Sequence, residues 1–475
     1  MSRKLLVLSL LLAIACSDQT EVTDPESAPD AAPSDGASDQ ELDFSSHRSF
    51  GAHTALSGGA TTIFDESPEA FGQPAPNLSA QALALHDVGD VNFEVEFEPE
   101  TGLGPVFDNV SCEECHLGDG RGTPPSDGAT FESMLFRGSV PGRGPHGGPN
   151  PIPGFGGQIQ LRAIPGFQPE ASAKITYTDS TGSFADGSTY TLRVPHYTLT
   201  GGYTSLPGGF LISPRTAPAV FGLGLLEAVP EWTIRDMADP FDRNRDGVSG
   251  RPNYAWDAIK QRTALGRFGW KANVPGLLQQ TAGAYNGDMG ITTTIFPAES
   301  CEGQTQYPGC AAHAPEIDPQ LVQAVAFYTQ TLGVPARRAL DDPTAQQGER
   351  LFYAAGCNAC HAPTLRTGVL RGVPAVSGQV IHPYTDLLLH DMGQALADGR
   401  SDFLASGTEW RTAPLWGVGL IETVNSHPNL LHDGRARNFL EAVMWHGGEA
   451  EPSRQRFLAM SKDERRDLIA FLESL

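Results

Sequence analysis

The motif Cys-x-x-Cys-His occurs twice in this chain, and no other feature restricts its possible folds as strongly. The copies are Cys112-Glu-Glu-Cys-His116 and Cys357-Asn-Ala-Cys-His361. In this motif two thiols attach covalently to a haem, and the adjacent histidine ligates its iron. A zinc site with four thiolates shares the Cys-x-x-Cys spacing, but it needs no histidine after each pair. The sequence therefore predicts two covalently attached haem c groups, with Cys112, Cys115, Cys357 and Cys360 as attachment points and His116 and His361 as axial ligands.

The first 45 residues predict export and a membrane anchor. A basic start precedes an apolar run from Leu5 to Ala15 that is too short to span a bilayer. The run ends at Ala13-Ile-Ala-Cys16, which resembles a bacterial lipobox. Residues 1–16 are therefore predicted to be a lipoprotein signal peptide with lipid on Cys16, and simple secretion with cleavage nearby is the alternative. Residues 17–45 have so few apolar side chains that they predict a disordered acidic tether. The expected location is the periplasm-facing cell envelope, with the membrane contacted through the lipid only.

Two cysteines remain after these assignments. Cys301 and Cys310 are predicted to form a disulfide in an oxidising compartment. A catalytic dithiol is the alternative, although the pair lacks the Cys-x-x-Cys spacing of reactive dithiols. The formal net charge is −24, which argues against a nucleic-acid partner because such binding needs a basic face. The acidity fits either a basic redox partner or a merely soluble surface.

Helical patterns flank both haem motifs. Residues 344–353 are expected to form a helix that leads into the second motif. Residues 461–475 are expected to form the last helix, because Ser461 and Glu464 can make a capping box and apolar residues follow at helical spacing. Residues 318–332 have the same character and would close the first half. These patterns predict a mainly α fold of two tandem cytochrome c-like domains with long loops, at 46–335 and 344–475.

An internal repeat supports this duplication. Residues 215–229 match residues 411–424 with one gap, both segments begin Arg-Thr-Ala-Pro, and each follows its own haem motif. Residues 170–212 differ in character, because β-branched and aromatic residues alternate there. This segment predicts a small β insertion, a hairpin, in the first domain.

Several stretches resemble one protein family. They are Gly104-Pro-Val-Phe107, Gly156-Gly-Gln-Ile-Gln160, Leu225-Leu-Glu-Ala-Val-Pro-Glu231, Gly266-Arg-Phe-Gly-Trp-Lys271, Leu430-Leu-His-Asp-Gly-Arg435 and Trp445-His-Gly-Gly-Glu-Ala450. From about Phe71 to Leu475 the chain is similar to the bacterial di-haem oxidoreductases, which are labelled peroxidases or thiol oxidoreductase-like proteins. More distantly it resembles the di-haem cytochrome c peroxidases. The resemblance implies the fold of that family.

The resemblance also implies different roles for the two haems. In the distant peroxidase relatives the N-terminal haem does the chemistry, and the six-coordinate C-terminal haem transfers electrons. Those relatives place a methionine ligand shortly before the element that begins at Arg411 here, where this chain has Glu409 and Trp410. His446 is therefore the first candidate for the sixth ligand of the second haem. The other candidates, each of which could instead pack or bond near a haem propionate, are His432, His390 and Met392.

A carboxylate or an amide near the first haem could act as a general acid or base in O–O cleavage. Glu227 is the candidate catalytic residue, because it lies where the relatives carry a distal acidic region. Its counterpart in the repeat is Glu422, so both could be structural. Gln158 and Gln160 are the alternatives. The residues that could relay electrons between the haems, or simply pack in the core, are Trp270 and Trp416.

The segment from Asp242 to Asn253 matches the start of an EF-hand calcium loop. Asp242, Asn244 and Asp246 stand at positions 1, 3 and 5, and Gly247 stands at position 6. Position 12 carries Asn253 instead of the usual glutamate. The pattern predicts a calcium site with altered geometry, and a turn held by its own side-chain hydrogen bonds is the alternative.

Together these expectations describe a di-haem c-type oxidoreductase of the cytochrome c peroxidase type. It would reduce hydrogen peroxide at the N-terminal haem. A donor protein, such as a small cytochrome or a cupredoxin, would supply electrons through the C-terminal haem. One rival is an electron-transfer protein with two permanently six-coordinate haems and no substrate chemistry. Another is a haem oxidase or oxygenase that acts on an organic or protein substrate.

Overall fold

The computed structural model describes residues 54–475, apart from residues 127, 129, 130, 132, 302, 308, 309 and 311–314. The predicted signal peptide, the lipidated Cys16 and the acidic tether lie outside the described residues. The described residues all belong to one compact unit, and the predicted boundary between residues 335 and 344 stays a prediction. Among the described residues, the helices are all too short or too polar to cross a bilayer.

The predicted mainly α fold of two cytochrome c-like domains is wrong. Helices make up 30% of the described residues and strands 20%. The strands of the described residues form six two-stranded sheets and one four-stranded sheet. Most of these strands are only two to four residues long, so they are too short to show the alternating pattern that identifies a strand in a sequence. The long connections between the helices were therefore read as loops.

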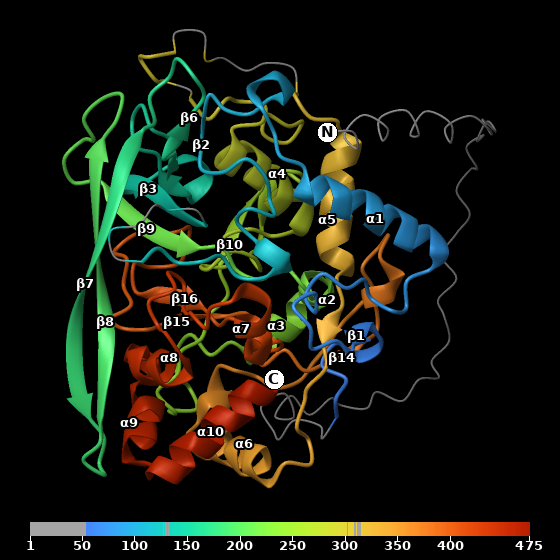
Figure 1. Ribbon diagram of the computed structural model, residues 1–475, viewed down its shortest axis with the longest axis vertical. Helices are drawn as coiled ribbons and strands as arrows, with labels where there is room; N and C mark the ends of the chain where they lie inside the picture. Colours follow the sequence, from blue (N-terminus) through green and yellow to red (C-terminus); the bar gives the residue numbers. More distant parts are fainter. Residues whose placement is uncertain are drawn as a thin grey trace. The chain divides into compact units, whose positions relative to one another are not determined.

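Two pairs of helices open and close the two halves of the chain (Figure 1). Three of these four helices were predicted from the sequence, but the one before the first haem motif was not. Helix α1 (Ala80–Glu94) packs against α5 (Pro319–Thr331), and α6 (Pro343–Ala354) packs against α10 (Lys462–Ser474). The predicted caps are present: Asp318 accepts a hydrogen bond from Gln320 N, and Ser461 and Glu464 form the capping box. Each haem motif follows the first helix of its pair.

Among the described residues, six further α-helices lie in sequence between the two members of a pair, three in each half. They are α2 (Leu223–Ala228), α3 (Glu231–Met237), α4 (Leu277–Met289), α7 (Ile421–Asn425), α8 (Phe439–Trp445) and α9 (Glu451–Ala459). The largest core cluster contains residues from both halves of the chain, including Phe71, Phe221 and Trp416. The two halves therefore share one core.

The largest sheet is antiparallel, and most of its strands precede the repeat segment of the first half. Its central strand β3 (Met134–Arg143) pairs with β9 (Leu211–Thr216), β5 (Gln158–Ile159) and β4 (Pro149–Asn150). Strand β9 carries Arg215 and Thr216, so the sheet fixes the start of the repeat segment. The remaining short pairs are β1 (Thr62–Ile63) with β12 (Val334–Pro335), β2 (Val106–Phe107) with β6 (Arg162–Ala163), β10 (Tyr254–Asp257) with β11 (Arg262–Leu265), β13 (Leu365–Arg366) with β14 (Val380–Ile381), and β15 (Leu389–Asp391) with β16 (Glu409–Arg411).

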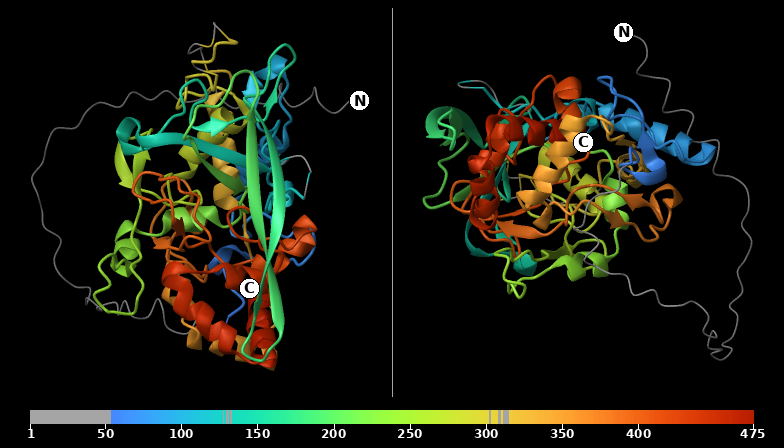
Figure 2. Two further views of the ribbon diagram at one scale, coloured as in Figure 1. Left: turned by 90° about the vertical axis from the view of Figure 1, so that its left-hand side faces the viewer. Right: turned by 90° about the horizontal axis from the view of Figure 1, so that it is seen from below.

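The predicted hairpin is present as β7 (Ala171–Ser183) and β8 (Thr189–Gly201), which pair along thirteen residues each. The turn of this hairpin contacts helices of the second half of the chain. Phe184 packs against Phe457 of α9, and Asp186 accepts a hydrogen bond from Arg465 of α10. In Figure 2 (left) the green hairpin accordingly ends beside the red C-terminal helices. The hairpin thus bridges both halves.

The two repeat segments contact each other reciprocally. Gly222 and Gly417 occupy matching positions in the repeat, and both have a left-handed backbone, with φ of 69° and 68°. A Cβ atom added to Gly222 would lie 2.7 Å from the ring of Trp416, and one added to Gly417 would lie 2.5 Å from the ring of Phe221. Each ring precedes the glycine of its own segment. A local two-fold axis between the two repeat segments produces such an exchange of equivalent contacts.

Candidate functional site

Both Cys-x-x-Cys-His motifs line the same internal cavity, which has a volume of about 460 Å³. Its walls include the Arg-Thr-Ala-Pro starts of both repeat segments and one face of α4. On that face Leu277, Thr281, Ala284 and Asp288 follow one another at helical spacing. The fold therefore brings motifs that lie far apart in the sequence to a single site.

The two motif histidines are held in the same way. His116 Nδ1 lies 2.7 Å from the carbonyl oxygen of Pro218, and His361 Nδ1 lies 2.9 Å from that of Tyr384. Such a bond fixes Nδ1 as the protonated nitrogen and leaves Nε2 as the one that can ligate a metal. Burial lowers the pKa of both imidazoles to about 4, so both are in the neutral form that iron requires.

The motif cysteines are available for attachment to a ligand. None of Cys112, Cys115, Cys357 and Cys360 forms a disulfide. Burial raises the pKa of Cys115 and of Cys357 to about 12, so both are thiols at neutral pH. Each pair stands beside its histidine on the wall of the cavity, which is the donor set for covalent haem attachment.

His446 faces the cavity at the second motif and has the geometry of an iron ligand. It follows the last turn of α8, and its Nδ1 lies 2.7 Å from the carbonyl oxygen of Ala442. Its Nε2 is thus the nitrogen that can bind a metal. The imidazole is close enough to His361 that a positive charge on His446 lowers the pKa of His361. Among the sequence-predicted ligands, His446 has the arrangement that mirrors the proximal histidines.

The other predicted ligands also line the cavity but have different surroundings. Both ring nitrogens of His390 face carboxylates, because Nε2 lies 3.0 Å from Asp386 and Nδ1 lies 2.8 Å from Glu449. These bonds occupy the nitrogens that iron would need. The His432 ring stacks on Trp410, with centroids 3.8 Å apart.

Buried cations at the cavity wall fit a ligand that carries carboxylates. Within the described part of the chain, neither Arg121 nor Arg411 forms an ion pair, and burial lowers the pKa of each to about 10. Thr216 and Thr412, equivalent residues of the repeat, each keep a buried hydroxyl without a hydrogen-bond partner in that part of the chain. Haem carries two propionates that would compensate such groups, since unpaired buried charges are costly. The residues therefore fit two haems.

Glu227 is not among the residues that line the cavity, and its carboxylate bonds to groups that hold the fold together. Its carboxylate accepts hydrogen bonds from Leu277 N (2.9 Å), at the first residue of α4, and from Gln330 Nε2 (2.6 Å). A carboxylate at a helix N-terminus stabilises that helix. This placement favours the structural reading of Glu227. Glu422, its counterpart in the repeat, is exposed.

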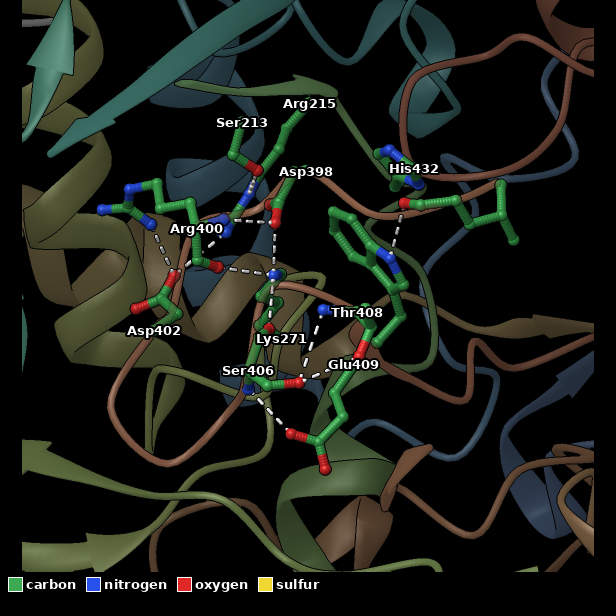
Figure 3. A network of polar contacts seen from close by, with 12 residues as sticks. Ser213, Arg215, Lys271, Asp398, Arg400, Asp402, Ser406, Thr408, Glu409 and His432 are labelled. Atoms are coloured by element: carbon green, nitrogen blue, oxygen red, sulfur yellow. Dashed lines mark hydrogen bonds and ion pairs between the residues drawn. The ribbon is translucent and has the colours of Figure 1, made fainter. Parts of the chain in front are cut away.

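Trp270 and Trp416, considered either as electron relays or as core residues, both line the cavity, and a third tryptophan, Trp410, does so too. Trp410 lies between the ring of His432 and the ammonium of Lys271, which is 4.5 Å from the centre of the indole ring. Figure 3 shows Lys271 at the centre of a buried network, where its Nζ donates to Asp398 Oδ1 and to the carbonyl oxygens of Arg400 and Ser406. The sequence analysis noted this lysine only as part of a matching stretch.

The predicted calcium loop is held by its own hydrogen bonds. Asp242 Oδ1 accepts from Gly247 N (3.2 Å), and Asp246 Oδ1 accepts from Val248 N (2.9 Å). Asn244 bonds to Asp246 through both its side-chain oxygen and its side-chain nitrogen. Asn253 points elsewhere, because its amide donates to the carbonyl oxygens of Lys271 and Asp402. These contacts match the alternative reading, and calcium binding remains a prediction.

Cys301 and Cys310 form the expected disulfide. The Cys301 carbonyl accepts a hydrogen bond from Gln304 N, and the Gln304 side chain donates to Glu170. The disulfide therefore closes a loop that places Gln304 against a buried carboxyl. This role is structural.

Several charged residues of the cavity wall were not predicted as site residues, among them Arg121, Arg411, Asp108 and Asp288. Two of these four named residues lie next to a sequence pattern. Asp108 directly follows Gly104-Pro-Val-Phe107, and Arg411 opens a repeat segment. Arg121 and Asp288 have no pattern around them that separates them from surface residues.

Comparison with known proteins identifies a family. The family described as "Di-haem oxidoreductase, putative peroxidase" matches residues 51–140 and 142–475. No curated protein matches the chain. A solved structure of hydrazine synthase from Kuenenia stuttgartiensis, pressurised with xenon, matches with 11% sequence identity and a TM-score of 0.32, over 96% of this chain and 100% of that one. A likeness this weak carries no argument about fold or function.

Proposed function

We propose that this chain, which belongs to the di-haem oxidoreductase family, is a peroxidase that reduces hydrogen peroxide at its first haem site and takes electrons in through its second. Family membership supports two haems and an oxidoreductase. The choice of peroxide and the direction of electron flow are our inference from the cavity.

The haems would attach to Cys112 and Cys115 and to Cys357 and Cys360, with His116 and His361 as axial ligands. When bound, they supply irons that change oxidation state and can bind a small oxygen-containing substrate. Arg121 and Arg411 would neutralise propionates. The chain's own contribution is to fix the imidazole tautomers and to keep the site buried.

The observation that carries the proposal is the difference between the two motifs. His446 faces the second motif with Nδ1 bonded to a carbonyl oxygen, in the manner of His361 itself. Two such imidazoles would give a six-coordinate iron, which suits electron transfer. At the first motif we find no histidine in this arrangement among the described cavity residues other than His116. The first site would thus keep a position for substrate.

The overall reaction sets what the partners must provide. Hydrogen peroxide takes up two electrons and two protons and yields two water molecules. A small cytochrome or a cupredoxin would deliver the electrons, and a basic donor surface would suit the acidic chain, whose net charge is −24. We place the protein at the periplasm-facing cell envelope, anchored by lipid on Cys16, because of its signal-like start.

A second candidate function is electron transfer without substrate chemistry. Met134 and Met289 also line the cavity, and Met289 ends α4, which forms part of the wall together with Cys112 and Cys115. A methionine thioether can serve as a sixth ligand to haem iron. If one of them did so at the first site, both haems would be six-coordinate and closed to peroxide.

Visible and EPR spectra of the purified di-haem protein distinguish these functions. The peroxidase should show one high-spin and one low-spin haem, in the oxidised or the half-reduced state, and peroxide should consume the high-spin signal. His446→Ala should convert the low-spin signal into a second high-spin signal. His196→Ala, at an exposed position on β8, should leave the spectra unchanged. Two low-spin haems whose spectra do not change with peroxide in either redox state would contradict the peroxidase and support the electron-transfer function.

A further inference from the structure

We propose that Asp108 and Asp288 together hold one proton beside the first Cys-x-x-Cys-His motif and act as the general acid of peroxide reduction, with Gln158 as a positioning residue. This inference rests on the proposed function and names the groups that would supply its protons.

The two carboxyls are brought together by the backbone. Asp108 follows β2, and Asp288 lies in the last turn of α4. The carbonyl oxygen of Asp288 accepts hydrogen bonds from the backbone N–H groups of Asp108 (2.7 Å) and Asn109 (3.2 Å). Both aspartates line the cavity together with Cys112 and Cys115. The pair is therefore fixed in position next to the first site.

One amide group joins the two side chains. Gln158 Nε2 donates to Asp108 Oδ2 at 2.6 Å and to Asp288 Oδ1 at 2.8 Å. The two carboxyls thus lie no farther apart than these two bonds together. The same nitrogen is 2.8 Å from the carbonyl oxygen of Gly287, so three acceptors compete for its two hydrogens. A proton on one of the carboxyls would relieve that shortage.

The charges around the pair also favour a proton on one of its two carboxyls. Arg137 of β3 attracts both carboxylates, but no ion pair with either of them is formed among the described residues. The other charged or titratable groups nearby are Arg162 and Glu170. Cys112 and Cys115 also face the pair, but as thioethers in the di-haem protein they would not titrate. Burial and mutual repulsion raise the pKa of Asp108 to about 8, and burial raises the pKa of Asp288. Two buried carboxyls this close share one proton at neutral pH.

Gln158 can serve either protonation state. Its Oε1 is buried and has no hydrogen-bond partner in the described part of the chain, as is true of Gln160 Oε1. Each glutamine side chain is only 3% exposed. As placed, the amide of Gln158 donates to carboxylates. Turned by half a rotation about its last bond, it would accept from the O–H of the protonated acid. The amide therefore suits a pair that gives up a proton and regains it.

The pair fits one step of the reaction. When the O–O bond breaks, the departing oxygen must leave as water, and the pair would give it one proton. The second proton would come from solvent, and both electrons would come from the donor protein. Solvent would then restore the proton on the pair. A general acid of this kind contributes about 10²–10⁴-fold to a rate.

The first test needs no turnover. The infrared spectrum of the di-haem protein, recorded from pH 6 to pH 10 (roughly two units either side of the raised pKa), should contain a protonated-carboxyl band that disappears near pH 8. Asp119 and Glu170 titrate in the same range, so the variants identify the pair's share of the band. Asp288→Asn and Asp108→Asn should each shift the loss of that share to lower pH, because the remaining carboxyl no longer has a negative neighbour. Asp179→Asn, at an exposed position on β7, should leave it in place. A wild-type protein without the band would overturn the shared proton.

The second test compares kinetics of the same variants. Each aspartate variant should lose about 10²–10⁴-fold in kcat for peroxide, with KM and the haem spectra unchanged. The shift of the infrared band with an unchanged kcat would overturn the catalytic role. A wild-type protein that does not turn over peroxide would sink the proposed function, and the infrared band would then still decide whether the pair holds a proton.

Discussion

At the scale of single residues, Lys271 is an unusual buried lysine. Its side chain is 0% exposed and its Nζ lies 2.7 Å from Asp398, which is itself 1% exposed. Burial lowers the pKa of the ammonium to about 8. The charge also faces the ring of Trp410, the tryptophan that stacks on His432. Lys271 thus supports a stack that reaches the cavity wall.

Lys271→Met should destabilise the protein by about 3–5 kcal/mol, because it would leave the carboxylate of Asp398 buried without its partner. Lys260→Met is a matched control. Lys260 also pairs with an aspartate, Asp257, but its side chain is 62% exposed, so its loss should cost less than about 1 kcal/mol. Denaturant unfolding of both variants at neutral pH measures the difference. Equal losses would mean that the buried pair adds nothing beyond a surface pair.

The sequence predicted the haem-binding residues and put His446 first among the candidate sixth ligands, but it gave no physical basis for separating the candidates. His446, His390 and His432 were all plausible sixth ligands, and only the partners of their ring nitrogens separate them. Glu227 looked catalytic by its place in the repeat, yet its carboxylate accepts from the first N–H of α4. Such partners come from segments distant in the sequence, so no local pattern encodes them.

At the scale of elements, both helix pairs cross at a glycine. A Cβ atom on Gly89 of α1 would collide with the carbonyl oxygen of Ala324 in α5, and one on Gly348 of α6 would collide with that of Asp467 in α10. The missing side chain therefore lets two backbones touch. Because this contact recurs in each half, it is a second structural trace of the duplication.

Gly348→Ala should force α6 and α10 apart and destabilise the protein by at least about 1–3 kcal/mol, the usual cost of overpacking a core. Gly283→Ala in α4 is the control, since its added Cβ would meet its nearest neighbour at an ordinary 3.6 Å. There alanine should stabilise the helix by up to about 1 kcal/mol. Thermal unfolding of both variants shows whether each substitution lowers or raises the stability. A gain in stability for Gly348→Ala would contradict the close helix contact.

The elements also show where sequence reasoning succeeds. Long helices with clear caps, such as α5 and α10, were predicted to within a few residues, and so was the region of the long hairpin. The two-residue strands, such as β2 and β6, were not. They form because tertiary contacts bring two extended segments together. Missing them led to the wrong fold class.

At the scale of the whole molecule, the two halves form one body around one cavity. The reciprocal packing of Phe221 on Gly417 and of Trp416 on Gly222 joins the repeat segments at its wall. The β7–β8 hairpin bridges the halves on the outside. The sequence analysis treated the halves as separate domains in tandem. A shared core and cavity explain how two motifs that lie far apart in the sequence could act together.

The stability of the whole molecule should depend on pH through its buried carboxyls. Burial raises the pKa of Asp119 to about 8, although Tyr328 donates a hydrogen bond to it. A raised pKa means that Asp119 stabilises the fold fully below about pH 4, and that this contribution is lost as pH rises to about 8. The slope is up to about 1.4 kcal/mol per pH unit. Wild-type protein should therefore lose stability across this range.

Asp119→Asn removes this titration and keeps an oxygen for Tyr328, and asparagine tolerates the positive φ of 58° at this position. Its free energy of unfolding, compared with wild type by denaturant titration, should rise steadily relative to wild type from pH 5 to pH 8, a window that lies between the ordinary and the raised pKa. Asp186→Asn is the control, because Ser188 and Arg465 lower the pKa of Asp186 to about 2. Its difference from wild type should stay constant over the same window. A constant difference for Asp119→Asn would mean that Asp119 is already ionised at pH 5, and that Tyr328 outweighs the cost of burying its charge.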